Sequence, residues 1–167
     1  MTPAAATRIG VISALLVLGA DQASKYWILM HLREVGQQIV LLPVLSLTLV
    51  KNPGVTFGLL NGLGWWGHFV LAGLALIVVC ALGLWLRRAD NAVAATAIGA
   101  IAGGAVGNVI DRLRYGAVVD FIHAYIGDWS WYVFNVADAA IVCGVAALIL
   151  ENQIRRRPPQ PKLKHSA

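Results

Sequence analysis

Charged residues are scarce in this sequence. Asp, Glu, Lys and Arg make up 13% of its 167 residues, against about 25% in an ordinary soluble domain. Hydrophobic residues make up 59%, and the mean hydropathy is +0.72. Such a chain cannot cover itself for water, which excludes a soluble domain. In lipid the backbone polar groups must be satisfied internally, by helices or by a closed barrel. The long unbroken apolar runs favour helices.

Motifs for several kinds of chemistry are also missing. The two cysteines, Cys80 and Cys143, lie in apolar runs without CxxC spacing, so we interpret them as small core residues. The four histidines are scattered, and the sequence contains neither an HExxH zinc motif nor a GxSxG nucleophile elbow. Nothing in the sequence supports a pairing of Ser130 with His123. We therefore expect neither a metal ion nor any other cofactor.

Four apolar segments are long enough to cross a bilayer, which takes about 20 helical residues. They cover residues about 9–30, 65–86, 92–112 and 132–154. The sequence therefore predicts an all-α integral membrane protein with four transmembrane helices. Residues 1–154 are expected to form a single membrane-embedded domain, and residues 155–167 a basic cytoplasmic tail.

The basic residues mark one side of the predicted bundle. They lie at segment ends rather than in one patch, so the net charge of +5 does not predict nucleic acid as a partner. The excess on one side comes from Arg8, Arg87, Arg88, Arg155, Arg156, Arg157, Lys162 and Lys164. By the positive-inside rule, both termini are cytoplasmic. The longer segments 31–64 and 112–131, which mix bases with acids, then face outward.

The two outward segments differ in character. Residues 37–60 are rich in β-branched residues and broken by proline and glycine, which predicts a small strand-and-turn element on the membrane. Residues 112–131 mix apolar, aromatic and charged side chains, which favours a short interfacial helix.

Ionisable residues inside the predicted spans need an explanation, because a charge in lipid is costly. Asp21 and Lys25 are four residues apart and share a helix face. They fit a self-neutralising pair and a direct role in a site about equally well. At the end of the third span, Asp111 and Arg112 are expected to pair with each other. The glycines of that span are expected to let another helix approach closely, and they recur at Gly99, Gly103 and Gly107.

Two further acids lie at the outer edge of the bundle. Asp120 stands among apolar neighbours in VVDF, and Asp138 follows Asn135 by three residues at the start of the fourth span. Both are expected at the same depth. Two carboxylates that converge in this way fit an ion site, a proton relay or an aspartic protease dyad, and the residues alone do not rank these three.

Five motifs in order carry a resemblance to a known family. They are residues 21–25 (DQASK), 52–57 (NPGVTF), 103–112 (GGAVGNVIDR), 118–121 (VVDF) and 134–138 (FNVAD). In order, spacing, chain length and four-span topology the sequence resembles lipoprotein signal peptidase, also called signal peptidase II. In one departure, Val55-Thr56 stands where the family usually has small residues such as Ala or Ser, which leaves the local pocket shape open.

The resemblance implies a bacterial inner-membrane aspartic endopeptidase. Members of the family remove signal peptides from prolipoproteins by cutting before a diacylglyceryl-modified cysteine. It also implies a small periplasmic β-cradle at 37–60 and a mobile periplasmic helix between the third and fourth spans. By resemblance the catalytic pair is Asp120 and Asp138. The substrate-binding residues are Asn52, Gly54, Asn108, Arg112 and Asn135, and the supporting residues are Asp21, Lys25 and Asp111.

The expected partners are lipid-modified prolipoproteins and membrane lipid, and the chain is expected to act as a monomer with its active site near the periplasmic surface. The alternative is a small proton- or ion-coupled transporter that uses the aspartates as a relay. Against it stand the absence of an internal repeat and the position of the acids at the outer edge. The sequence does not identify the prolipoproteins that are cut.

Overall fold

The computed structural model describes residues 1–54 and 66–155. Its longest elements are four helices, each long and apolar enough to cross a bilayer. They are α1 (Pro3–His31), α2 (Gly67–Leu86), α3 (Ala92–Tyr115) and α4 (Val136–Arg155). The four-helix prediction is confirmed. The first helix begins earlier than predicted because Thr2 caps it, accepting a hydrogen bond from the Ala5 amide at 3.2 Å, and Pro3 occupies its first turn.

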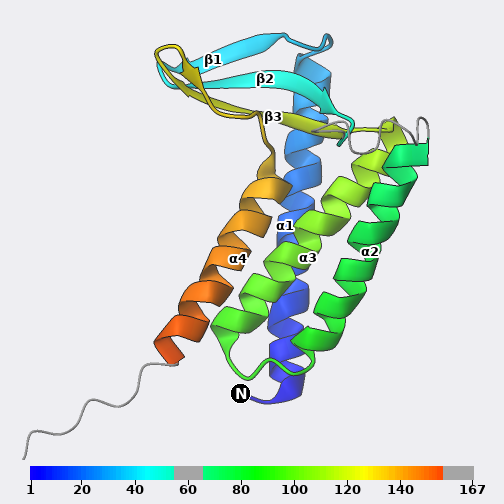
Figure 1. Cartoon of the computed structure of the whole chain (residues 1–167), viewed down its shortest axis with the longest axis vertical. Coiled ribbons are helices and arrows are strands. Elements are labelled where there is room, and N and C mark those ends of the chain that lie inside the picture. Colours follow the sequence, from blue (N-terminus) through cyan, green and yellow to red (C-terminus); the bar gives the residue numbers. More distant parts are fainter. Residues whose placement is uncertain (55–65, 156–167) are drawn as a thin grey trace, which may run out of the picture.

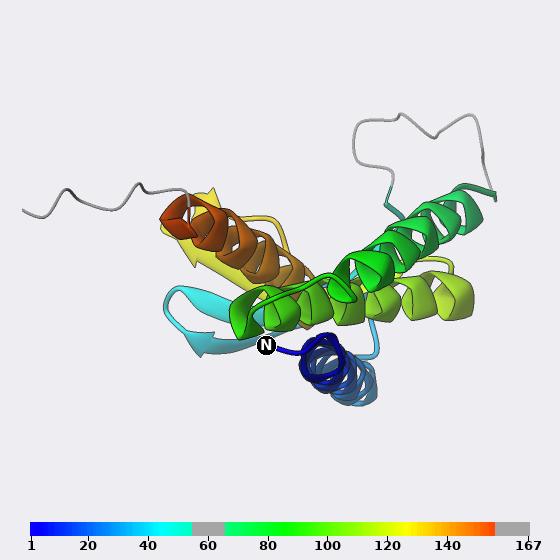
Figure 2. The same ribbon diagram turned by 90° about the horizontal axis from the view of Figure 1, so that it is seen from below.

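Helix α3 is the centre of the bundle and packs against the other three helices (Figures 1 and 2). Its glycine stripe faces α1 at very close range. A Cβ on Gly99 or Gly103 would overlap the backbone of Gly10 or Ala14 in α1. The expectation that these glycines let a neighbouring helix approach is therefore confirmed.

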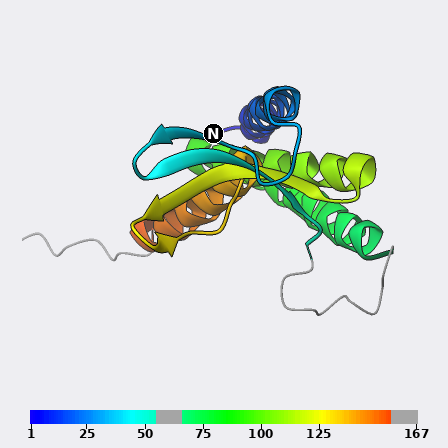
Figure 3. The same ribbon diagram turned by 90° about the horizontal axis from the view of Figure 1, so that it is seen from above.

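A four-stranded antiparallel sheet lies across one end of the bundle (Figures 1 and 3). Its strands are β1 (Gln38–Leu42), β2 (Leu45–Asn52), β3 (Val118–Ile126) and β4 (Trp129–Ser130), in the order β1-β2-β3-β4. Beneath it, Ile28 at the end of α1 packs with Leu49, Val119 and Phe121 of the sheet. This apolar cluster fixes the sheet to the end of the bundle where α1 and α3 finish and where α2 and α4 begin.

The prediction of a short helix between the third and fourth spans is wrong for the part of the chain that the structure describes. Residues 118–126 there form β3, which continues the sheet begun by β1 and β2. The reason is long-range pairing: Val119 lies opposite Lys51 and Asp120 opposite Val50. Helix α3 itself runs on to Tyr115 and ends at Gly116, whose φ of +70° suits glycine.

Several predicted features fall partly outside the described residues. The first is the end of the strand-and-turn element after Gly54, which includes Val55-Thr56. The others are residue 65, where the second span was predicted to begin, and the tail from residue 156 on. Arg155, the first residue of the predicted tail, is the last residue of α4. There its guanidinium pairs with Asp90 at 2.5 Å, which ties α4 to the loop between α2 and α3.

Candidate active site

Asp120 is held on β3 by one amide donor on each carboxylate oxygen. Asn135 donates to Oδ1 at 2.6 Å, and Asn52 donates to Oδ2 at 3.0 Å. The side-chain oxygen of Asn52 accepts from the Gly54 amide at 2.9 Å, a small turn that fixes which end of the Asn52 amide faces Asp120. Only 2% of Asp120 is exposed. The carboxyl group is therefore buried and tightly oriented.

Asp138 is oriented by the start of its own helix. Asn135 precedes α4, and its side-chain oxygen accepts from the Asp138 amide at 2.9 Å, while the Asn135 amide donates to Oδ2 of Asp138 at 3.3 Å. This reciprocal pair has the geometry of a capping box. Asn108 of α3 adds a third bond, from Nδ2 to Oδ1 of Asp138, at 2.8 Å. The N-terminal cap of α4 thus places Asp138 beside Asn135, which also contacts Asp120.

The electrostatics of the two acids are linked. Burial raises the pKa of Asp120 to about 6, and the charge of Asp138 pushes it in the same direction, against the lowering effect of the bonds from Asn52 and Asn135. A carboxyl group with this pKa exchanges its proton near neutral pH. Such perturbed acids are characteristic of catalytic sites.

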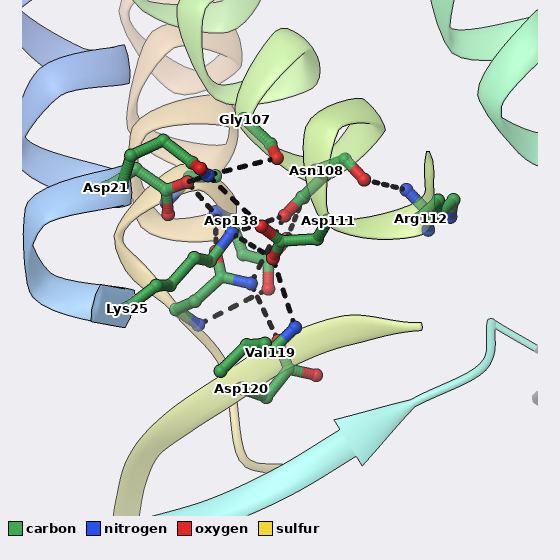
Figure 4. Close-up of polar contacts among 12 residues, drawn as sticks. Asp21, Lys25, Gly107, Asn108, Asp111, Arg112, Val119, Asp120 and Asp138 are labelled. Atoms are coloured by element: carbon green, nitrogen blue, oxygen red, sulfur yellow. Dashed lines mark hydrogen bonds and ion pairs between the residues drawn. The ribbon is translucent and has the colours of Figure 1, made fainter. Parts of the chain in front are cut away.

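A buried cluster of charged side chains lies next to Asp120 and Asp138, between α1 and α3. Figure 4 shows Lys25 of α1 between Asp21 of the same helix and Asp111 of α3. The Lys25 ammonium lies 2.8 Å from both carboxylates and 3.1 Å from the Asn108 oxygen. All three charged side chains are at most 3% exposed. The predicted Asp21–Lys25 pair is confirmed, and it also contacts Asn108, which holds Asp138.

The expected pairing of Asp111 with Arg112 is wrong. Asp111 pairs with Lys25 and accepts from the Val119 amide at 3.1 Å, while Arg112 points away from the cluster in Figure 4 and donates to the Asn108 carbonyl at 3.2 Å. Adjacent residues on a helix do not face each other, and Lys25 lies on the side to which Asp111 projects. Asp111 thereby connects α3 and α1 to β3.

The structure adds one residue to which the sequence analysis gave no role. Gln22 donates to Asp21 and Asp111, both at 3.1 Å, and to the Gly107 carbonyl at 3.3 Å. Asp21 in turn accepts from the Ala137 amide in the first turn of α4, at 2.9 Å. The available signal was a long amide side chain beside a buried acid in an apolar span.

Arg112 and Gly54 lie side by side at one edge of the site. The Arg112 Nε is buried and has no hydrogen-bond partner among residues 1–54 and 66–155. A Cβ on Gly54, whose φ is +78°, would lie 3.6 Å from the Arg112 guanidinium and would overlap Leu71 of α2. The positive φ and the close approach of Leu71 both require glycine at this position, and the adjacent Arg112 Nε is a donor suited to a carbonyl oxygen.

Other chemistries are less well built. Within the described ranges no three His, Cys, Asp or Glu side chains are arranged to hold a metal ion. His123 and Ser130 do meet, with Nε2 and Oγ 2.6 Å apart. The second partner of His123 is the Thr48 hydroxyl at 3.4 Å, where a serine protease triad has a carboxylate. The pair therefore lacks the group that would activate the serine.

A cavity of about 430 Å³ opens beyond Asp120. It is lined by Asp120 and His123 of β3, by residues 50–53 at the end of β2, and by residues 130–133. We call this cavity the outer trough.

Known proteins resemble this chain in sequence and in fold. The family model described as signal peptidase (SPase) II matches residues 13–154. The chain belongs to the signal peptidase II family. It is 47% identical over 157 residues to the lipoprotein signal peptidase of Methylorubrum extorquens (strain PA1), covering 93% of this chain and 91% of that one. It is 42% identical over 159 residues to that of Rhodopseudomonas palustris (strain ATCC BAA-98 / CGA009), covering 92% and 95%.

Two solved structures, each described as a bacterial membrane enzyme, share the fold. One has a TM-score of 0.74 at 28% identity over 92% of this chain and 94% of that one. The other has a TM-score of 0.76 at 29% identity over 86% and 91%. This signal peptidase II is accordingly a multi-pass membrane aspartic peptidase. The transporter alternative finds no support in these comparisons.

Proposed function

We propose that this signal peptidase II uses Asp120 and Asp138 as its catalytic pair to cut prolipoproteins before the diacylglyceryl-modified cysteine. The observation that carries the proposal is the Asn135 side chain, which contacts Asp120 through its amide nitrogen and the Asp138 backbone through its oxygen. An acid on a strand of the sheet and an acid on a helix of the bundle thereby share one side chain.

The chemistry follows from that arrangement. Two neighbouring carboxylates do not both ionise cheaply, so the pair shares one proton. The ionised member takes a proton from a water molecule that attacks the scissile carbonyl carbon. The protonated member donates to the carbonyl oxygen and later gives its proton to the leaving amine. The acid and base roles belong to the pair as a unit.

The surrounding donors suit an unwound substrate. A peptide bond can be attacked only when the signal peptide is locally extended, which frees backbone groups that need partners. Among residues 1–54 and 66–155, the buried Arg112 Nε beside Gly54 has no hydrogen-bond partner. Asn52, Asn108 and Asn135 hold the carboxylates directly. We assign substrate positioning to all five residues, and structural support to Asp21, Lys25 and Asp111.

The position of the site in the bundle explains why the substrate would need its diacylglyceryl group. The site lies where the helices meet the sheet, at the end opposite to the basic residues Arg87, Arg88 and Arg155. The positive-inside rule then puts the site near the periplasmic surface and both termini in the cytoplasm. Each CH₂ of a diacylglyceryl group adds about 0.8 kcal/mol when held in the bilayer, so the lipid fixes the cysteine at the depth of the aspartates. Residues 1–154 act as one domain, as a monomer.

Cleavage of matched substrates tests the proposal. Purified protein in a bilayer is given equal concentrations of a prolipoprotein with and without the diacylglyceryl group. We expect the modified form to be cut before its cysteine and the unmodified form to remain intact. Equal cleavage of both would contradict lipid anchoring, and cleavage of neither would contradict the proposed function.

A further inference from the structure

The outer trough belongs to the proposed catalytic site, but a second cavity lies at the opposite end of the bundle. It measures about 390 Å³ and lies between the end of α4 and the loop that joins α2 to α3 (Figure 1). We call it the inner cavity. We propose that the inner cavity binds a phospholipid whose headgroup carries both a phosphate and a primary ammonium group, as in phosphatidylethanolamine. This lipid site is independent of the proposed cleavage.

The lining of the inner cavity changes from apolar to polar toward the ends of the helices. Its deeper part includes Trp85 of α2 and Ile149 of α4, which are 49% and 53% exposed. Arg88 follows Trp85 by one helical turn, and Arg155 is the last residue of α4. Because α2 and α4 span the membrane, the apolar side chains lie at the level of acyl chains and the polar ones at the level of headgroups. Pockets between the ends of membrane helices are known to bind phospholipid headgroups.

Among the described residues, the outer part of the inner cavity holds one uncompensated charge of each sign. Asp90 and Glu151 both line it, and the single guanidinium of Arg155 serves both, at 2.5 Å and 3.2 Å. One positive charge therefore balances only one of these two carboxylates. Arg88 is exposed in the same cavity and has no ion-pair partner within residues 1–54 and 66–155.

A headgroup with both charges supplies the two missing partners. Its phosphate oxygens accept from the guanidinium of Arg88, a pairing that arginine favours. Its ammonium group donates N–H bonds to the carboxylates of Asp90 and Glu151. The hydrogen bonds from Arg155 and Asn91 hold the pKa of Asp90 below its usual range, so this carboxylate stays ionised. A trimethylated ammonium has no N–H donor and an anionic headgroup has no cation, so both match the inner cavity less well.

Lipids with identical acyl chains test the choice of headgroup. The full chain in a non-ionic detergent is titrated with phosphatidylethanolamine, phosphatidylcholine or phosphatidylglycerol, and the rise in melting temperature with lipid concentration gives an apparent Kd. We expect phosphatidylethanolamine to bind about two- to fivefold more tightly than the other two, the size of an exposed ion pair. Free phosphoethanolamine, which has no acyl chains, should cause no shift at the same concentrations. Equal Kd values for the three lipids, or an equal shift with free phosphoethanolamine, would overturn the proposal.

Variants assign the preference to the inner cavity. Glu151→Gln keeps an oxygen that can accept from Asn91 and Arg155 but removes the surplus negative charge, so phosphatidylethanolamine and phosphatidylcholine should bind equally. Arg88→Gln should weaken the binding of phosphatidylethanolamine by about two- to fivefold. Arg87→Gln removes an exposed arginine of the same loop that does not line the inner cavity and should leave that binding unchanged. A preference that survives in Glu151→Gln, or an equal loss in Arg87→Gln and Arg88→Gln, would overturn the site.

Discussion

The side-chain amide of Asn135 donates to the carboxylate of Asp120 at 2.6 Å. The same side chain accepts from the first turn of α4 through the Asp138 amide. One buried residue thus caps a membrane helix and also orients a carboxylate of the sheet. The fold and the proposed chemistry therefore depend on the same side chain.

Replacing either proposed catalytic acid by its amide should abolish cleavage. Asp120→Asn and Asp138→Asn keep the shape of the side chain but remove the exchangeable proton. We expect cleavage of a modified prolipoprotein, followed on gels, to fall by at least the roughly 10²- to 10⁴-fold that general acid–base catalysis contributes. Asp128→Asn, an exposed change in the β3–β4 turn, should keep near-normal activity. Activity in Asp120→Asn with loss in Asp128→Asn would refute the assignment.

Removing Asn135 should separate capping from catalysis when it is compared with another cap. Asn91 caps α3 at the opposite end of the bundle, accepting from the Ala94 amide at 2.8 Å. Loss of an N-cap costs about 1 kcal/mol, so Asn91→Ala and Asn135→Ala should both lower the melting temperature in detergent. Only Asn135→Ala should also lose most of its cleavage rate, because it frees Asp120. Equal activity in the two variants would contradict the proposal that Asn135 orients Asp120 for catalysis.

The pH profile should carry the signature of the shared proton. Burial raises the pKa of Asp120 to about 6, so the pair loses its proton as the pH rises through that value. We expect kcat/KM to fall about tenfold per pH unit above it. The link to folding has the same sign: stability contributed by the raised pKa is present below the ordinary value of 3.8 and is lost as the pH rises through about 6.

Asn52 provides a check on that profile. Its hydrogen bond to Asp120 lowers the pKa of that carboxyl group, so Asn52→Ala should shift the basic limb of kcat/KM to higher pH as well as slow the reaction. A limb that stays in place while the rate falls would mean that another group titrates.

Most residues of the site could be predicted from the sequence, but few of the contacts between them could. Asp120, Asp138 and Asn135 were found as polar residues among apolar neighbours, and their proposed roles came from the motifs they share with signal peptidase II. Lys25–Asp111 and the pairing of β2 with β3 join residues about 70 to 90 positions apart, and local patterns carry no information about such partners. The pairing of Asp111 with Arg112 was expected for the same reason, because only neighbours are visible in a sequence.

Segment 118–126 illustrates the limit for secondary structure. Its mixture of apolar, aromatic and charged residues led to the prediction of a short helix, where the structure has a strand. The strand forms because β2 is already in place to pair with it, and Ile28 and Leu49 cover its inner face. Tertiary context of this kind outweighs local propensity.

Reporter fusions should test the proposed orientation. Since Lys and Arg gather at the N-tail, the 87–91 loop and the C-tail, fusions at Ala89 and Ala167 should report a cytoplasmic location. A fusion at Gly36, in the turn between α1 and β1, should report a periplasmic one. The reverse pattern would place the catalytic pair on the cytoplasmic side and contradict the proposed access from the periplasm.

The charge of Lys25 should matter more than that of any exposed lysine. Lys25→Met leaves Asp21 and Asp111 buried without a cation, and breaking a buried pair costs about 3–5 kcal/mol. We expect a large drop in the temperature at which the detergent-solubilised protein aggregates, and loss of cleavage because Asn108, which orients Asp138, loses its hydrogen bond from Lys25. Lys51→Met, which removes an exposed lysine from β2, should leave that temperature unchanged.

A second substitution should distinguish lost charge balance from lost packing. In Lys25→Met with Asp111→Asn, one uncompensated carboxylate is replaced by a neutral amide that can still accept from Val119. The double variant should therefore recover part of the stability that Lys25→Met loses. It should recover little activity, because the Lys25 bond to Asn108 at 3.1 Å remains absent. If the double variant were less stable than Lys25→Met alone, charge balance would not be the reason for the buried lysine.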